Sequence, residues 1–151
     1  MARFRYRMQN ILDIKEKIES QEKIAYSQAN AALTEEQDKL TKLLIRRAGY
    51  ERDLKSASVG ELDFNEIKRL KEAIETMKVL VREQMLNVHI AEKRVEEARQ
   101  RLDEVMKDRK THENLKEKAF DEFKQELNAE ENKITDELVS YTFRPDENGE
   151  N

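Results

Sequence analysis

The fold is decided by residues 67–105, which read IKRLKEAIETMKVLVREQMLNVHIAEKRVEEARQRLDEV. Six apolar residues in this stretch stand seven positions apart without interruption: Ile67, Ile74, Val81, Val88, Val95 and Leu102. A second column, three residues after each of them, reads Leu70, Met77, Gln84, Ala91, Ala98 and Val105. Two such columns at heptad spacing, one rich in β-branched residues, are typical of a coiled-coil helix that packs along one narrow face.

The composition excludes most other fold classes. Charged residues make up 41% of the 151 residues and hydrophobic residues 37%, whereas about 25% and 45–50% are usual. With three glycines and one proline, the chain lacks the frequent turns that β-sandwiches, barrels and alternating βα folds require. We therefore predict an all-α protein.

A first helix is predicted ahead of the quoted stretch, over residues 5–55. Most residues between its apolar positions are Glu, Lys, Gln and Arg, which are good helix formers. Its apolar column starts with Met8, Ile11, Ile18, Ala25 and Ala32. We expect that column to drift by one position, because helix twist and heptad do not match, and to continue through Tyr26, Leu33, Leu40 and Leu54.

One turn is predicted between the two helices, over residues 56–62. Serines and Gly60 cluster there, and a glycine adopts the left-handed conformation of a tight turn at little cost. Asp63, followed by Glu66 three residues later, resembles a capping box. The second helix is therefore expected over residues 63–140.

Two helices joined by a short turn run antiparallel. We predict an antiparallel two-helix coiled coil, a long α-hairpin that forms a single domain over residues 1–151 with a frayed tail over residues 141–151. The turn pairs residues whose numbers add to roughly 119. Because this seam closes within the chain, we expect a monomer; the alternative is a homodimeric coiled-coil scaffold or tether.

The second helix should extend beyond the first in this register. The extension would present an apolar stripe with no partner inside the chain, comprising Phe120, Phe123, Leu127, Ile134 and Leu138. An uncovered stripe of this kind marks an interaction surface. Self-association of two such stripes and a frayed tail are the alternatives.

Polar residues interrupt the predicted seam at Arg47, Gln84, Arg109 and His112. A buried polar group penalises slipped pairings, so these residues can select the register. The alternative is a locally loose seam or a docking point.

Several kinds of chemistry are not expected. The chain has no cysteine, and the phosphate-binding, dinucleotide and zinc-protease motifs are absent from the sequence. His89 and His112 lie too far apart on one helix to share a metal ion. Acidic residues outnumber basic ones by 33 to 29, which disfavours nucleic acid as the partner. We expect no enzymatic activity, no cofactor and no insertion into a membrane.

The first residues of the chain are basic and aromatic, with arginines at positions 3, 5 and 7 around Phe4 and Tyr6. Such a segment can bind an acidic protein groove or anionic lipid, at roughly 1 kcal/mol per arginine near a lipid surface. A frayed cationic terminus is the alternative.

Two short motifs lie near the ends of the chain. Residues 4–15 read FRYRMQNILDIK and residues 131–138 read ENKITDEL. The first resembles the opening of the flagellar export protein family FliJ of Gram-positive-type bacteria, and the second resembles that family's E-x-K-x-x-D-E ending. The chain length and the break near residue 60 are also similar to the family's.

The resemblance implies a non-enzymatic component of the flagellar type III export apparatus, and so a role in flagellum biogenesis, motility and chemotaxis. It implies an antiparallel coiled coil similar to the central stalk of rotary ATP synthases. The implied partners are the hexameric, FliI-like export ATPase, the FlhA-like export gate protein and export chaperones. The implied location is the cytoplasm, at the cytoplasmic face of the cell membrane through the apparatus.

The resemblance also implies two binding sites. Positions that match the family's gate-binding surface near the turn are Leu43, Tyr50, Leu70 and Ala73. Positions at the end of the hairpin that enters the ATPase ring are Met8, Ile11, Phe120 and Phe123. The chain departs from the family at Met77, where some relatives have histidine, and at Arg46 and Glu66, where they have aromatic residues.

Overall fold

Two α-helices make up most of the chain, whose computed structural model describes residues 2–142. Helix α1 comprises Gln9–Ala57 and helix α2 comprises Phe64–Thr142. The two long helices pack against each other, as predicted for a helical hairpin. Helix α2 includes the first two residues of the predicted frayed tail, and the remainder of that tail lies outside the described residues.

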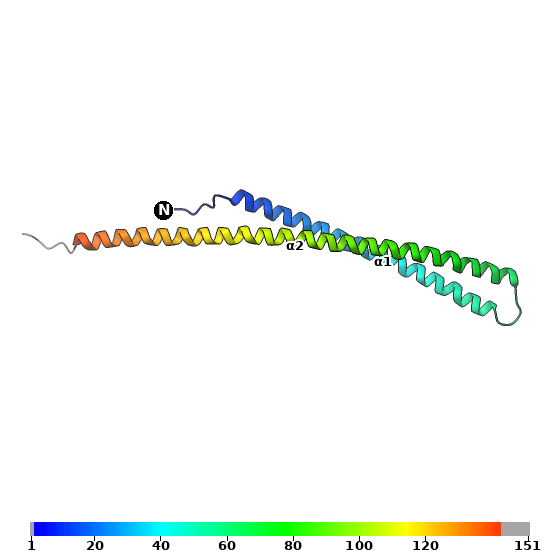
Figure 1. Cartoon of the computed structure of the whole chain (residues 1–151). Coiled ribbons are helices and arrows are strands. Elements are labelled where there is room, and N and C mark those ends of the chain that lie inside the picture. The colour runs from blue at the N-terminus through cyan, green and yellow to red at the C-terminus, as the bar shows by residue number, and fades with distance from the viewer. Residues whose placement is uncertain (1, 143–151) are drawn as a thin grey trace, which may run out of the picture. The chain divides into compact units, whose positions relative to one another are not determined.

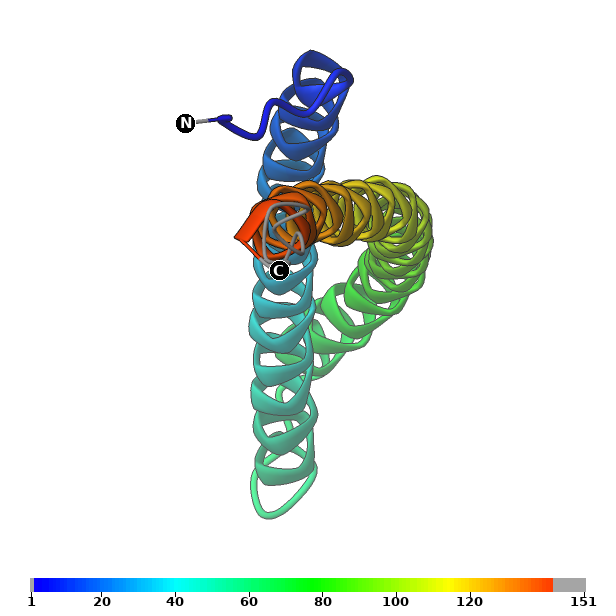
Figure 2. The same ribbon diagram turned by 90° about the vertical axis from the view of Figure 1, so that its left-hand side faces the viewer.

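The chain divides into two compact units. The hairpin unit is Ile18–Val105, and the termini unit is Met1–Lys17 together with Met106–Asn151. Each unit contains a segment of both helices. Within the hairpin unit, Figures 1 and 2 show the turn that links the cyan end of α1 to the green start of α2. That the two units form one domain remains a prediction.

Helix α1 begins later than the sequence predicts, at Gln9 instead of residue 5. Its first turn is closed by hydrogen bonds from the Gln9 amide to the Tyr6 carbonyl, at 3.2 Å, and from the Ile11 amide to the Met8 carbonyl, at 3.0 Å. Residues 2–6 have no regular secondary structure. Three arginines at a helix N-terminus would add positive charge where the helix dipole is already positive, which disfavours an earlier start.

The heptad columns of α2 form the core of the hairpin unit, as predicted. Seven buried apolar side chains of α2 come from these columns: Leu70, Ile74, Met77, Val81, Val88, Ala91 and Ala98. The second column is the more deeply buried of the two, since all of its members from Leu70 to Ala98 are buried, whereas Ile67, Val95 and Leu102 are half-buried. Helix α2 therefore packs along the narrow face that the spacing indicates.

The seam column of α1 differs from the prediction at its N-terminal end. Leu12 is only 2% exposed and Glu19 6%, whereas Ile11 is 38% exposed. One column of buried and half-buried positions runs along α1 in steps of seven: Leu12, Glu19, Tyr26, Leu33, Leu40, Arg47 and Leu54. The predicted drift is therefore wrong, because one column continues through a charged residue, Glu19, without a shift.

Contacts between the helices define the register in each unit. In the hairpin unit, Gln84 contacts Glu36 and Arg101 Nε lies 3.7 Å from Glu22 Oε2. The residue numbers of these pairs add to 120 and 123. In the termini unit, Lys15 Nζ lies 2.6 Å from Asp108 Oδ2, a pair whose numbers add to 123. The observed sums exceed the predicted sum of roughly 119 by no more residues than make up about one helical turn.

Gln84 is a buried polar residue in the seam, with 7% of its surface exposed. Its Nε2 donates to the Glu36 main-chain carbonyl at 2.8 Å and to Glu36 Oε2 at 2.5 Å. Its Oε1 accepts from Asn87 Nδ2 at 3.2 Å. A side chain with this many partners is satisfied only when α1 and α2 are aligned in this register, which supports the role in register selection.

Candidate interaction surfaces

The turn between the helices is built by two residues with defined backbone roles. Gly60 has a φ of +84°, the left-handed conformation that favours glycine. Asp63 Oδ1 accepts from the backbone amides of Asn65, at 3.1 Å, and Glu66, at 3.3 Å, and so caps the first turn of α2. Both features were predicted from the sequence.

The second half of the predicted capping box is wrong. Among the described residues, the Glu66 carboxylate makes no bond to the Asp63 amide and instead accepts from Arg69 Nε at 3.0 Å and Nη2 at 2.6 Å. This hydrogen bond lowers the pKa of Glu66. The same hydrogen bond raises the pKa of Arg69. The negative charges of Tyr50 and Asp53 on α1 raise that pKa further, by a smaller amount.

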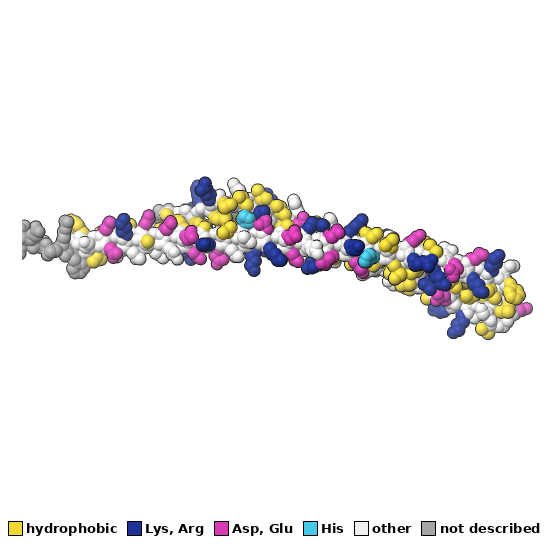
Figure 3. Space-filling model, in the orientation of Figure 1, with side chains coloured by type: hydrophobic (Ala, Val, Ile, Leu, Met, Phe, Trp, Pro, Cys, Tyr) yellow, Lys and Arg dark blue, Asp and Glu magenta, His cyan; other side chains and the backbone are white. Residues whose placement is uncertain are grey.

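Exposed apolar side chains gather at the turn, at the right-hand end of Figure 3. Val59 is 76% exposed, Leu62 48% and Phe64 75%. We call these three residues, with the half-buried Leu43, Tyr50 and Ala73, the tip surface. Glu61 and Asp63 lie between the apolar residues of the turn, and the exposed Lys55 and Lys68 flank the turn on α1 and α2, so this surface combines apolar area with charges of both signs.

Leu70, a predicted gate-binding residue, is 1% exposed and has the largest fully buried side chain among the described residues. A partner cannot reach it unless the helices separate. Its place is therefore in the core of the hairpin unit.

Three aromatic rings meet in the termini unit. The Phe4 ring lies 5.0 Å from the Phe120 ring, edge-on at 64°, and 5.5 Å from the Phe123 ring. Lys124 Nζ lies 4.7 Å from the centre of the Phe120 ring. The expectation that Phe120 and Phe123 have no partner inside the chain is therefore wrong, because the segment before α1 covers part of them.

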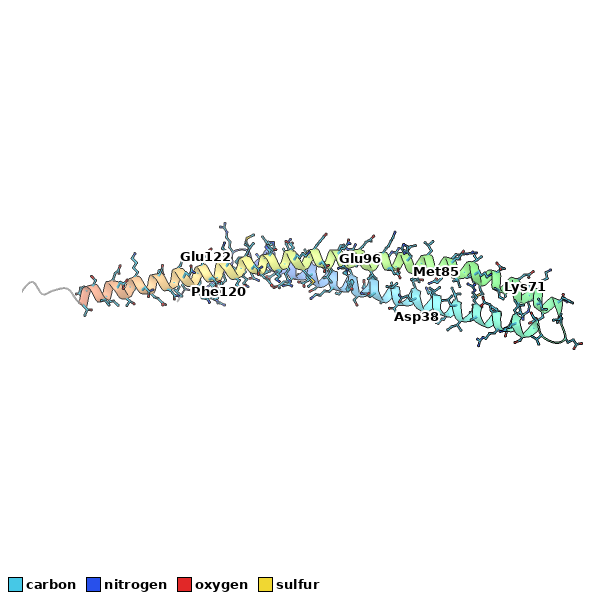
Figure 4. All side chains as sticks on the ribbon, turned by 60° about the horizontal axis from the view of Figure 1, so that its bottom comes forward. Asp38, Lys71, Met85, Glu96, Phe120 and Glu122 are labelled. Carbon is cyan, nitrogen blue, oxygen red and sulfur yellow. The ribbon has the colours of Figure 1, made fainter. Side chains whose placement is uncertain are left out.

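The other predicted residues of this end are accessible. Met8 is 40% exposed, Ile11 38% and Phe120 39%, and Phe123 is half-buried. We call these four residues the termini surface. In Figure 4, Phe120 and Glu122 lie on opposite sides of α2.

The C-terminal part of α2 presents an apolar stripe, as predicted. Ile134 is 58% exposed, Leu138 62% and Tyr141 78%, while Leu127 is half-buried. These residues are seven, four and three positions apart, which places them along one side of the helix.

A groove of about 330 Å³ runs beside the seam of the hairpin unit. It is lined by Ala29, Ala32, Glu36, Asn87, Ile90, Ala91 and Arg94. Glu22 on α1 pairs with Arg101 on α2. One heptad further along the antiparallel helices, Ala29 stands in the place of Glu22 and Arg94 in the place of Arg101. The methyl group of Ala29 is too short to reach Arg94. The small side chain at position 29 therefore leaves the groove open.

No cluster of metal-binding side chains is found within residues 2–142. In that range, no three His, Asp or Glu side chains come together as metal ligands. Neither helix, as far as it is described, contains a stretch apolar and long enough to cross a membrane.

Comparisons with known proteins agree with this geometry. The family described as "Flagellar FliJ protein" matches residues 4–148. The chain belongs to the FliJ family. It is accordingly a component of the type III export apparatus, and members of this family are structural and not enzymatic.

A solved structure has a similar fold. The structure of a proposed YscO homolog from Chlamydia trachomatis superimposes with a TM-score of 0.63 at 22% sequence identity, covering 93% of this chain and 95% of that chain. No curated protein matches the sequence. At this identity the likeness concerns the fold alone, and the FliJ assignment rests on the family match.

Proposed function

We propose that this FliJ-family chain binds the export ATPase and the export gate and contributes binding energy and geometry, with no chemistry of its own. The observation that carries the proposal is the exposure of apolar side chains on two separate surfaces, the tip surface and the termini surface. Contiguous apolar surface exposed on a protein indicates a partner. Two surfaces built from different residues, one in each unit, suit two different partners.

The termini surface and the apolar stripe after it are the proposed contact with the ATPase ring. Met8, Ile11, Phe120 and Phe123 supply the apolar side chains. A ligand that binds the assembled hexamer more tightly than separate subunits shifts the equilibrium toward the hexamer. The chain would promote assembly of the ATPase by this route.

The tip surface is the proposed contact with the export gate. Leu43, Tyr50 and Ala73 are its half-buried members near the turn. Phe64 and Val59 are the most exposed, and large exposed aromatic residues are the usual anchors of an interface.

The proposed location follows from these partners. The chain acts on the cytoplasmic side of the cell membrane and is held there through the apparatus. Export chaperones are the third class of partner that we propose, and we expect the chain alone to be a monomer.

The test uses two matched truncations of aromatic residues. Phe120→Ala together with Phe123→Ala should abolish stimulation of ATP hydrolysis by the purified export ATPase and leave binding to the purified gate domain unchanged. Phe64→Ala should weaken gate binding and leave the ATPase response intact. If the unmodified chain changes neither the hydrolysis rate nor the oligomeric state of the ATPase, the ATPase half of the proposal is wrong.

A homodimeric scaffold is the alternative class. The contacts from Gln84 to Glu36 and from Arg101 to Glu22 close the seam within one chain, which disfavours it. Light scattering at micromolar concentration should give the monomer mass of 17.9 kDa. A stable species of twice that mass would favour the scaffold.

A further inference from the structure

The Phe120–Phe123 region of α2 is a partly filled socket. One ring from outside the helix, Phe4, lies against both of its aromatic rings, with centroid distances of 5.0 and 5.5 Å. Edge-on and tilted arrangements at these distances are favourable for aromatic pairs. We call this pair of rings on α2 the aromatic socket.

The segment that fills the aromatic socket is attached to the rest of the unit by few contacts. Residues 2–6 have no regular secondary structure. Within the described part of the chain, Arg3 and Arg5 on either side of Phe4 form neither an ion pair nor a hydrogen bond. Phe4 is the residue of this segment whose ring lies against the socket, and its truncation should release residues 2–5 from α2.

The segment and the part of α2 from the aromatic socket onward carry opposite net charge. Residues 2–8 contain three arginines and no acidic residue, while residues 121–142 contain seven acidic residues and two lysines. The segment therefore shows that this stretch of α2 accepts an aromatic side chain, and the opposite net charge favours one that is flanked by cations. Opposite charge steers such a segment toward the helix over distances of about 8 Å at physiological salt.

We infer that the aromatic socket is a receptor for cationic–aromatic segments, which residues 2–7 fill within the chain and from which a partner displaces them with a segment of the same chemistry. The inference rests on the proposed contact between the termini surface and the export ATPase. It adds that the ATPase presents an aromatic or large apolar side chain flanked by basic residues, and that Phe4 competes with it.

Competition within the chain has a measurable effect on affinity. A protein that is competent to bind for only a fraction of the time shows an affinity reduced by that fraction. If Phe4 fills the socket about nine-tenths of the time, its removal should tighten binding to the ATPase about tenfold.

The first experiment compares Phe4→Ala with Phe64→Ala, an equal truncation on the tip surface, by titrating each full-length variant with the purified export ATPase. Phe4→Ala should bind about tenfold more tightly than the unmodified chain, and Phe64→Ala should bind equally well. Unchanged or weaker binding of Phe4→Ala would overturn the inference, because Phe4 would then be a bystander or part of the contact.

The second experiment needs no ATPase and so separates this inference from the proposed function. The chain has no tryptophan, so Phe4→Trp places a single tryptophan over the socket, whose emission can be excited apart from that of the four tyrosines. A peptide of residues 2–8 at millimolar concentration should shift its emission to the red by displacing it, whereas the same peptide with Ala in place of Phe4 should not. No shift, or equal shifts with both peptides, would overturn the inference even if the ATPase binds.

Discussion

Replacing Gln84 with leucine tests whether a buried hydrogen bond in the seam determines pairing or stability. The substitution removes the bonds from Nε2 to the Glu36 carbonyl and carboxylate. A neutral bond contributes about 0.5–1.5 kcal/mol and a bond to a charged group about 1.5–3 kcal/mol. Burial of the leucine side chain at this position adds about 1.5–3 kcal/mol to the free energy of unfolding, which offsets the lost hydrogen bonds.

The partners of Gln84 retain other contacts after the substitution. The Glu36 carbonyl keeps its bond within α1, and the Glu36 carboxylate, 27% exposed, lies 3.7 Å from Lys39. We therefore expect Gln84→Leu to change the free energy of unfolding by less than about 1 kcal/mol in urea titrations. The mass measured by light scattering should rise with concentration, because an all-apolar column no longer penalises pairing between chains or in slipped registers.

Gln100→Leu, at an exposed position of α2, is the control and should remain a monomer. A loss of more than about 3 kcal/mol in Gln84→Leu, with the mass unchanged, would show that the bonds stabilise the fold. Equal stability with a monomer at every concentration would show that Gln84 has no role in register selection.

Three further predictions concern single positions. Gly49→Ala should raise the free energy of unfolding by about 1 kcal/mol, because an added Cβ meets no atom within 4 Å and alanine favours the helix; Gly60→Ala, at a φ of +84°, should lower it by about 1–2 kcal/mol. Ala29→Glu should extend the row of ion pairs between the helices toward Arg94 and raise the free energy of unfolding by at most about 1 kcal/mol, an increase that high salt should abolish. Lys15 lowers the pKa of Asp108 through their hydrogen bond. The pair therefore stabilises the fold fully at any pH above the ordinary pKa of an aspartate, about 4. This contribution is lost as the pH falls through the lowered pKa of Asp108. Asp108→Asn should therefore flatten the acid limb of a stability–pH curve measured by circular dichroism, and an unchanged limb would contradict the assignment.

The fold was largely predictable because its determinants are local. The unbroken columns of α2, the glycine at position 60 and the cap at Asp63 each specify their own structure, and the helix register follows once the turn is known. The observed pairs, with sums of 120 and 123, lie close to the expected one because a turn of fixed length leaves little freedom.

The seam of α1 was misassigned at its start because one of its positions is charged. Tyr26 and Leu33 mark the column correctly, and a step of seven toward the N-terminus reaches Glu19 and then Leu12. The prediction used Ile11 and Ile18, because Ile18 is apolar whereas its neighbour in the true column, Glu19, is charged. The heptad period, which the backbone imposes, was a better guide than side-chain hydropathy.

The contact of Phe4 with the aromatic socket could not be predicted from periodicity. Residues 2–6 are not helical, so their side chains have no fixed spacing relative to α2. The available signal was the run of arginines before Gln9, which disfavours a helix and leaves Phe4 free to fold back. Leu70 was chosen for the gate-binding surface because it lies near the turn. It stands in the second heptad column of α2, which packs into the seam, and its side chain is therefore buried.

The account depends most directly on the chain folding back on itself at the turn. The chain has no cysteine, so Asp38→Cys and Arg82→Cys place one spin label on each helix at exposed positions of the hairpin unit. Electron–electron distance measurements, with excess unlabelled chain to suppress contacts between molecules, should give about 20–35 Å for packed helices carrying labels. A distance near 66 Å, about 1.5 Å for each of the intervening residues of one continuous helix, would contradict the hairpin and every surface assigned on it.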